Sequence, residues 1–346
     1  MKILVTGAAG FIGSSFARLA LSAGHQLIIL DKLTYAGHLE NVESLIDEKN
    51  CFFKQGDISD RDLVSLLLAH HRVHALANFA AESHVDNSIH SPREFIDTNV
   101  IGTYNLLECA KKYWSSLDEK EKKEFRYLQV STDEVYGTLG DDGKFHEELP
   151  YQPNSPYSAS KAAADHLVRA WHHTYGLPTI TTNCSNNYGP RQYPEKLIPV
   201  MITKALQGKP LPVYGNGANV RDWIHVEDHA AGVLLALTRG IPGETYCFGG
   251  DSERKNIDVV KAVCSALDEL QPKQDGSSYS QLISFVQDRA GHDWRYAMDD
   301  RKAQKHLGFE RRYKNFEDGL RSTIQWYLGN TNWCEAVLKK NQKVST

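Results

Sequence analysis

The chain has 346 residues, 41% of them hydrophobic and 24% charged, with a formal net charge of −4. Its length favours one large domain with a smaller one, and its weakly acidic balance argues against nucleic acid or an anionic membrane as partner. The six cysteines are scattered without a CxxC pair or zinc spacing, and no apolar run approaches the ~20 residues of a membrane span, so we expect reduced thiols, no metal site and a cytoplasmic protein.

Short apolar runs alternate with helical patterns in the first half of the chain. Predicted strands are Ile3–Thr6, Gln26–Leu30, Cys51–Gln55, His74–Phe79 and Tyr127–Ser131. The stretches between them predict helices near residues 11–23, 39–48, 60–70 and 94–114. This alternation is typical of βαβ units and a mostly parallel sheet. The sequence therefore predicts a doubly wound, Rossmann-type α/β fold with its ligand crevice at the carboxyl ends of the strands.

The pattern changes after residue 150. Ser155 and Pro156 are typical of an N-cap and first turn, and they start a predicted helix that runs to about residue 175. Leu177–Cys184 then predicts a sixth strand, and later helices are expected at 227–238, 257–270 and 315–328. We expect a large domain over residues 1–185, a smaller α/β domain over 186–330 from which some chain returns to the sheet, and a C-terminal tail over 331–346.

Glycines at positions 7, 10 and 13 follow the first predicted strand and precede a helix. In that context a tight turn, close approach to a pyrophosphate and close helix–strand packing each require a glycine. The helix N-terminus would offer its N–H groups to the diphosphate. Asp31, which ends the second strand, would bind an adenosine ribose and repel a 2′-phosphate, although Lys32 could tolerate one. The motif therefore predicts NAD rather than NADP, and makes 1–185 the cofactor domain.

Two later strand ends fit the same cofactor. Asp57 and Ile58 follow the third strand and would either contact the adenine or cap the next helix. Ala80 and Ala81 follow the fourth strand and are small enough for close approach of the cofactor.

Two pairs of reactive side chains follow the fifth strand. Tyr157 and Lys161 lie four residues apart on a predicted helix, which puts them on one face. A free tyrosine titrates near ~10. An adjacent ammonium group would supply much of the stabilisation that lowers this pKa toward the value a base needs, and an oxidised nicotinamide ring would supply more. Asp133 and Glu134 supply a second acid/base pair, but neighbouring strand residues face opposite sides, so they can converge only where the backbone leaves the sheet. Burial and the like charge next to it would keep Asp133 protonated.

Taken together, these motifs resemble the extended short-chain dehydrogenase/reductase superfamily that acts on nucleotide sugars. The resemblance covers residue 1 to about 330, and it is closest to the dTDP-glucose 4,6-dehydratase family. The segments that carry it are Asp31–Gly37, Ala80–Asp86, Ser131–Gly137, Asn183–Pro190, Pro194–Pro199 and Arg221–Trp223.

The resemblance implies NAD-dependent dehydration of dTDP-glucose to a 4-keto-6-deoxy sugar. The sugar is oxidised at C4, loses its C5 proton and C6 hydroxyl, and receives the hydride back at C6. By resemblance, Tyr157 takes the proton of the C4 hydroxyl, whose oxygen Thr132 would hydrogen-bond. Glu134 removes the C5 proton, and Asp133 protonates the departing C6 hydroxyl. Each proton transfer is worth about 10²–10⁴-fold in rate.

Binding residues also follow from the resemblance. For the cofactor they are Gly7, Gly10, Phe11, Ile12, Gly13, Asp31, Lys32, Leu33, Thr34, Asp57, Ile58, Ala80, Ala81, Thr98, Tyr157, Lys161 and Asn187. For the nucleotide sugar they are Ser83, His84, Thr132, Asn186, Lys196, Leu197, Pro212, Tyr214, Arg221, Asn256, Arg289 and His292. The chain departs from the family pattern at Asn87, where Arg is usual, and at Ala290, where Pro is usual. The resemblance further implies a homodimer, formed through a four-helix bundle from the helices near 94–114 and 156–175.

Two other readings remain open from the sequence. A nucleotide-sugar 4-epimerase or decarboxylase would share the scaffold, but an epimerase has no use for Asp133 and Glu134. A non-enzymatic NAD sensor would be expected to have lost Tyr157 or Lys161, and both are present.

Overall fold

A parallel sheet forms the centre of the molecule. The computed structural model describes residues 1–47, 49–288 and 293–344. Its largest sheet has seven strands in the order β10-β6-β5-β4-β1-β2-β3, and every neighbouring pair is parallel. The predicted doubly wound α/β fold is therefore confirmed. The strands are β1 (Lys2–Thr6), β2 (Gln26–Asp31), β3 (Cys51–Gln55), β4 (Ala75–Asn78), β5 (Arg126–Val130), β6 (Thr179–Cys184) and β10 (Thr245–Phe248).

Helices cover both faces of this sheet. One face packs on α1 (Phe11–Ser22), α9 (Val226–Arg239) and α11 (Arg301–Leu307), and the other on α2 (Arg61–His71), α5 (Thr103–Ser115) and α7 (Pro156–Tyr175). Successive strand residues point to opposite faces. Ile3 and Val5 of β1 accordingly join the first apolar core, and Leu4 joins the second. The near-continuous apolar strands are what a sheet covered on both faces requires.

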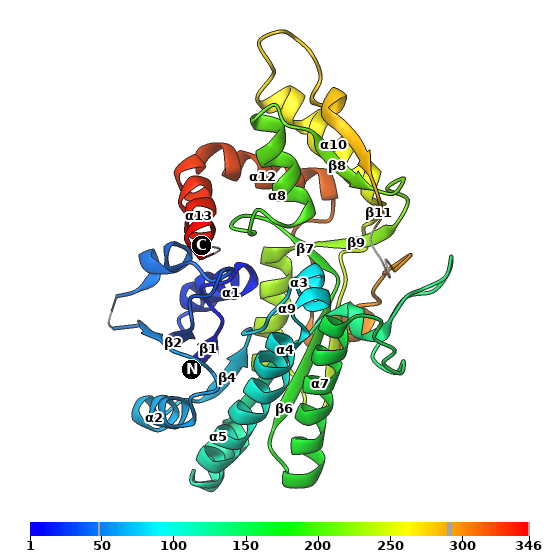
Figure 1. The fold of residues 1–346 in the computed structure, drawn as a ribbon. Helices are drawn as coiled ribbons and strands as arrows, with labels where there is room; N and C mark the ends of the chain where they lie inside the picture. The colour runs from blue at the N-terminus through cyan, green and yellow to red at the C-terminus, as the bar shows by residue number, and fades with distance from the viewer. Residues whose placement is uncertain (48, 289–292, 345–346) are drawn as a thin grey trace.

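A smaller lobe stands above the carboxyl ends of these strands (Figure 1). It holds a three-stranded sheet, β11-β9-β7, and a two-stranded sheet, β12-β8, packed with helices over a third apolar core. Its strands are β7 (Asn186–Tyr188), β8 (Leu211–Tyr214), β9 (Val220–His225), β11 (Glu253–Lys255) and β12 (Ile283–Val286). Its helices are α8 (Leu197–Leu206), α10 (Asn256–Leu270), α12 (Phe316–Gly329) and α13 (Thr331–Val344). Strand β10 and helices α9 and α11 return to the large sheet, so chain beyond residue 185 contributes to it.

The predicted helix over residues 39–48 is wrong. Two short 3₁₀ turns, Leu39–Asn41 and Glu43–Leu45, stand there instead. Val42 separates them with φ −127° because its side chain is buried in the core. Asp47 then accepts the backbone N–H groups of Asn50 and Cys51, which turns the chain into β3.

The predicted helix near 94–114 begins earlier and is not uniformly α-helical. It consists of α4 (Pro92–Phe95), a π-helical segment Ile96–Gly102 and α5. Two shorter helices flank this run, α3 (Val85–His90) and α6 (Glu119–Glu124). The residues expected to form a C-terminal tail include helix α13. No helix in the described part of the chain is long and apolar enough to cross a membrane.

Candidate active site

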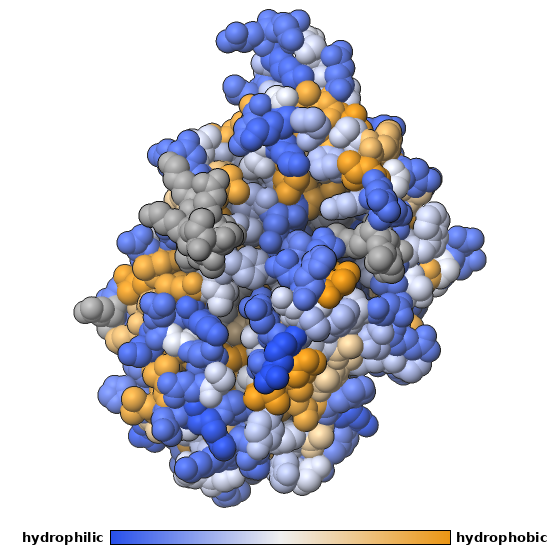
Figure 2. Space-filling view, viewed as in Figure 1, coloured by the Kyte–Doolittle hydropathy of each residue, from blue (hydrophilic) through white to orange (hydrophobic). Residues whose placement is uncertain are grey.

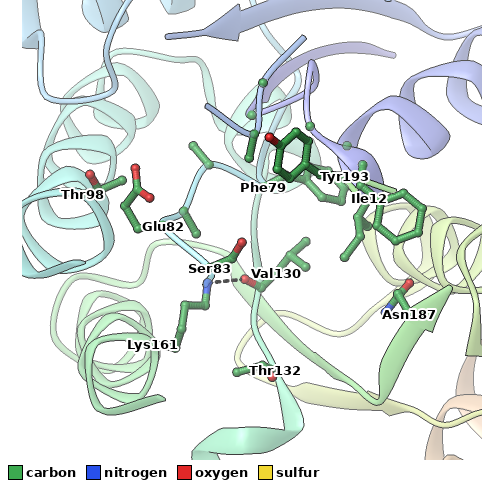
Figure 3. A pocket seen from close by; sticks show the side chains of 18 of the residues that line it. Ile12, Phe79, Glu82, Ser83, Thr98, Val130, Thr132, Lys161, Asn187 and Tyr193 are labelled. Carbon is green, nitrogen blue, oxygen red and sulfur yellow. Dashed lines mark hydrogen bonds between the residues drawn. The ribbon is translucent and has the colours of Figure 1, made fainter. Parts of the chain in front are cut away.

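A cleft opens at the carboxyl ends of β1, β2, β4, β5 and β6, beneath the smaller lobe. Figure 3 shows Lys161 and Thr132 toward one end of it, and Phe79, Tyr193 and Ile12 toward the other. Predicted residues that line the cleft are Gly7, Gly10, Phe11, Ile12, Gly13, Asp31, Lys32, Thr34, Asp57, Ile58, Ala80, Ala81, Ser83, Thr98, Thr132, Asp133, Glu134, Tyr157, Lys161, Asn186, Asn187 and Lys196.

The turn between β1 and α1 leaves no room for a side chain at Gly7 or Gly13. Gly7 has φ +70°, and a Cβ atom there would lie 2.5 Å from the backbone nitrogen of Ala80. A Cβ atom on Gly13 would lie 2.4 Å from the carbonyl oxygen of Gly7. Helix α1 has no side-chain cap and no acidic residue in its first turn. Its N–H groups and positive dipole end therefore suit a diphosphate, so the residues present fit a dinucleotide.

Asp31 links this turn to the end of β2. Its carboxylate accepts the backbone N–H of Ala9 at 2.8 Å and that of Leu33 at 2.8 Å. Lys32, next in the chain, forms an ion pair of 2.8 Å with Asp57 at the end of β3. A carboxylate beside a glycine turn suits an adenosine ribose, and Lys32 is already engaged by an acid.

Asp133 and Glu134 lie where the chain leaves β5. The strand ends at Val130, and Asp133–Tyr136 form a 3₁₀ turn capped by the hydroxyl of Thr132, which accepts the N–H of Glu134 at 3.3 Å. The expectation that the backbone leaves the sheet here is confirmed, and both acids line the cleft.

Burial raises the pKa of Asp133 well above its usual value, and the charge of Glu134 raises it further, as the sequence predicted. One carboxyl oxygen accepts the Thr132 hydroxyl at 3.1 Å, while Oδ2 is buried with no hydrogen-bond partner among the described residues. A carboxyl group held neutral with one oxygen unengaged is suited to act as a general acid.

Tyr157 and Lys161 occupy the first turns of α7. Ser155 and Ser158 form a reciprocal cap that fixes the start of this helix, and Pro156 occupies its first position. Both side chains are buried, and the Lys161 ammonium donates to the carbonyl oxygen of Val130 at 2.7 Å.

The pKa of Tyr157 differs from the sequence expectation. Burial raises it well above its usual value, and the charge of Glu134 raises it further. Burial also lowers the pKa of Lys161, against the opposing effect of Asp165. The reason is that Lys161 is directed to a backbone carbonyl, so in the protein alone desolvation outweighs its influence on the phenol.

Two asparagines close the cleft from the smaller lobe. The side-chain amide oxygen of Asn186 is buried, and no group in the described part of the chain hydrogen-bonds to it. Asn187 is held by its amide, which donates to the carbonyl oxygen of Ser185 at 3.0 Å, and by a bond of 3.0 Å to His229. Lys196 reaches across the cleft and donates to the carbonyl oxygen of Ser83 at 3.1 Å.

Several predicted residues lie outside the lining of this cleft. Arg221 donates to the carbonyl oxygens of Val220, Asp293 and Trp294, and its guanidinium stacks 4.2 Å from the ring centroid of Tyr296. The others are Leu33, His84, Leu197, Pro212, Tyr214 and Asn256. Arg289 and His292, with Ala290, lie outside the described residues. The roles given to all of these residues stay predictions.

The prediction missed a further group of lining residues. These are Leu30, Ala36, Gly37, Phe79, Glu82, Val130, Ser131, Cys184, Ser185, Gln192, Tyr193 and Glu195. Burial raises the pKa of Glu82, and it raises the pKa of Glu195 to about 6. The position of Glu82 just beyond a strand end was a usable signal. Gln192 and Tyr193 carried none, because they lie in a loop of the smaller lobe. No group of three or more metal-binding side chains occurs among the described residues.

Comparison with known proteins gives one consistent result. A family model described as GDP-mannose 4,6 dehydratase matches residues 4–323. A dTDP-glucose 4,6-dehydratase of Xanthomonas campestris pv. campestris is 56% identical over 335 residues, or 97% of this chain and 95% of that protein. The crystal structure of dTDP-glucose 4,6-dehydratase from Bacillus anthracis in complex with NAD has a TM-score of 0.86 at 45% identity, covering 97% of this chain and 99% of that one. That of the Streptomyces venezuelae enzyme with NAD and TYD bound has a TM-score of 0.88 at 42% identity, covering 97% and 100%.

Proposed function

The chain belongs to the GDP-mannose 4,6-dehydratase family, and from that premise we propose that it catalyses the NAD-dependent dehydration of dTDP-glucose to dTDP-4-keto-6-deoxyglucose. The enzyme is a hydro-lyase. The observation that carries the proposal is the pair of a buried Asp133 and a half-buried Glu134, which line the same cleft as Tyr157 and a dinucleotide-binding glycine turn.

NAD, when bound, supplies the hydride acceptor at C4 and the hydride donor at C6. The protein moves the protons. Tyr157 takes the proton of the C4 hydroxyl, and Thr132 donates a hydrogen bond to that oxygen. Glu134 then removes the C5 proton, which the C4 ketone has acidified, and it returns a proton to C5 when the hydride is delivered to C6. Asp133, kept neutral by burial, protonates the departing C6 hydroxyl.

The cofactor residues have separate tasks in this proposal. Gly7, Gly10 and Gly13 let the backbone approach the pyrophosphate, and Asp31 holds the adenosine ribose. Lys161 orients Tyr157 and Asn187 holds the cofactor, while Asn186 and Lys196 hold the nucleotide sugar.

Incubation with dTDP-glucose and mass spectrometry of the product tests the proposal. Loss of one water from the sugar without net consumption of NAD is the expected result. A product of unchanged mass with inverted C4 would instead identify an epimerase, which needs only hydride exchange at C4. The Asp133–Glu134 pair favours the dehydratase, because an epimerase has no leaving group to protonate.

We also propose that the chain forms a homodimer through the helical run 92–115 and α7. Large apolar side chains are exposed on these helices, among them Ile101 at 51% and Tyr104 at 39%. Figure 2 shows apolar residues at the surface over this part of the molecule. Light scattering should give a dimer mass for the wild type and a monomer mass for Ile101→Glu. The domain boundaries near residues 185 and 330, and a cytoplasmic location, stay predictions from the sequence.

A further inference from the structure

Helix α13 connects the smaller lobe to the glycine turn that receives the cofactor. It follows α12, whose Ile324 and Tyr327 belong to the apolar core of the smaller lobe. In Figure 1 the helix, drawn in red, lies beside the N-terminal part of the chain. A hydrogen bond between Trp333 of α13 and Asn41 joins residues that are far apart in the sequence. Helix α13 therefore connects the smaller lobe to the N-terminal part of the chain.

Trp333 makes that connection. Its ring packs edge-on against Trp326, with the ring centroids 5.0 Å apart, and against Tyr327 at 6.3 Å. On its other side it meets His38 edge-on at 6.5 Å. Its indole nitrogen donates to Oδ1 of Asn41 at 2.9 Å.

Asn41 connects Trp333 to the glycine turn through a second hydrogen bond. Its side chain is buried, and its Nδ2 donates to the carbonyl oxygen of Ala9 at 2.8 Å. The backbone N–H of His38 donates to the same oxygen at 3.0 Å, and the N–H of Ala9 donates to Asp31. An indole N–H can only donate, so it requires the oxygen of the Asn41 amide and leaves the nitrogen to face Ala9. Trp333 thereby fixes the amide orientation that holds the middle of the Gly7–Gly13 turn.

A second contact from the same cluster reaches the cleft. The ring of His38 stacks on Tyr193 with the centroids 5.5 Å apart and the planes at 15°. Tyr193 lines the cleft. The Tyr327 hydroxyl donates to the carbonyl oxygen of the neighbouring Gln192 at 2.5 Å. Trp326, Tyr327, Trp333 and His38 form an aromatic cluster that therefore supports both the glycine turn and the part of the cleft wall formed by Gln192 and Tyr193.

We propose that Trp333 is a positioning residue that slows the loss of bound NAD, by holding the glycine turn through Asn41. The inference rests on the proposed function. A dehydratase that returns the hydride to the same sugar must keep its cofactor between the two hydride transfers. An enzyme that released NADH between these transfers would leave the keto sugar without a hydride donor. A further contact that holds the glycine turn in place therefore helps the enzyme to complete the reaction.

The test compares two matched variants by the rate at which they release NAD. Trp333→Phe keeps an aromatic ring in the cluster and removes the indole N–H. Trp326→Phe removes an indole N–H from the same cluster, but that nitrogen makes no hydrogen bond within the described part of the chain. Holoenzyme loaded with radiolabelled NAD is mixed with excess unlabelled NAD, and the retained label is followed with time. We expect Trp333→Phe to release NAD about three- to tenfold faster than the wild type, the range for one lost hydrogen bond, and Trp326→Phe to behave as wild type.

A double-mutant cycle shows whether the effect passes through Asn41. In an Asn41→Ala background, Trp333→Phe should have little further effect on the release rate, because the hydrogen bonds from Trp333 to Asn41 and from Asn41 to Ala9 are already absent. A structural role alone would lower the melting temperature of both tryptophan variants and leave NAD release unchanged.

Equal release rates for Trp333→Phe and the wild type would overturn the inference, and so would an undiminished effect of Trp333→Phe in the Asn41→Ala background. If Asn41→Ala does not fold, the comparison of the two tryptophan variants decides alone. A wild-type chain that retains no NAD would overturn the proposed function and this inference together. Retention by the wild type, with no change in the variant, overturns the inference only.

Discussion

Asp133→Asn should separate catalysis from stability. The amide keeps the shape of the carboxyl group and an oxygen to accept the Thr132 hydroxyl, but it has no proton to give to the departing C6 hydroxyl. We expect turnover to fall by about 10²–10⁴-fold, the usual worth of a positioned general acid. C4 oxidation does not need Asp133, so NADH should accumulate on the enzyme and be visible by its absorbance.

The same variant should gain stability relative to the wild type as the pH rises. The pKa of Asp133 is raised in the folded protein, first by burial and then by Glu134. Above the unfolded reference of about 3.9, the unfolded chain releases a proton that the folded chain still holds. The wild type therefore loses about 1.4 kcal/mol of unfolding free energy per pH unit until the pH reaches the folded pKa. The amide of Asp133→Asn does not ionise in this range, so the variant does not lose unfolding free energy in this way.

Urea unfolding from acid to neutral pH measures this difference. Asp222→Asn is the contrasting variant: burial raises the pKa of Asp222 as well, but its carboxyl group accepts the backbone N–H groups of Gly250 and Ser252. It should be destabilised, because an amide can accept through only one of its two positions. Undiminished turnover of Asp133→Asn, or a stability difference from the wild type that does not change with pH, would refute the reasoning.

Three further predictions concern the same cleft. Gly13→Ala should abolish measurable NAD binding by calorimetry, because its Cβ would lie 2.4 Å from the carbonyl oxygen of Gly7, and normal affinity would contradict the proposed cradle. Glu134→Gln should permit C4 oxidation but slow C5 deprotonation by about 10²–10⁴-fold, so that rapid mixing with dTDP-glucose traps NADH; absence of trapped NADH would count against its role. The same substitution removes a charge that raises the pKa of Tyr157, so the rate of C4 oxidation, which rises with pH as the phenol ionises, should rise at lower pH than in the wild type. An unshifted profile would show that another group controls that step.

The sequence predicted the large sheet well because its signal is local. Strands such as β1 and β2 are short apolar runs, and both faces of the sheet are covered, so the runs need no finer pattern; strand β10, from the second half of the chain, was not predicted. The glycine turn was equally predictable from the Gly7, Gly10 and Gly13 pattern, and Gly13 is required by a backbone contact within one strand–turn–helix unit, although the contact that requires Gly7 is with Ala80, beyond β4. The region 39–48 failed because its course is decided by the burial of Val42 and the backbone bonds to Asp47, neither of which propensity describes.

Contacts between segments that are far apart in the chain could not be predicted from the sequence. Nothing in the pattern of residues 331–346 relates Trp333 to Asn41, so that end of the chain was expected to be a tail. Gln192 and Tyr193 reach the cleft for a similar reason, because the fold of the smaller lobe places their loop in its lining. Such residues belong to the cleft through tertiary structure alone.

The electrostatics of Tyr157 show what the protein by itself does not supply. Burial and the Glu134 carboxylate both disfavour the phenolate, while Lys161 is directed to the carbonyl oxygen of Val130. A buried tyrosine in this state is a poor base. The positive charge that an oxidised nicotinamide ring carries would favour the phenolate, and reduction of the ring would remove that charge. The phenolate would then be most populated when hydride is to be taken from C4 and less populated once the ketone has formed. In this arrangement the acidity of Tyr157 follows the redox state of the cofactor, which gives the enzyme a reason to bury its base.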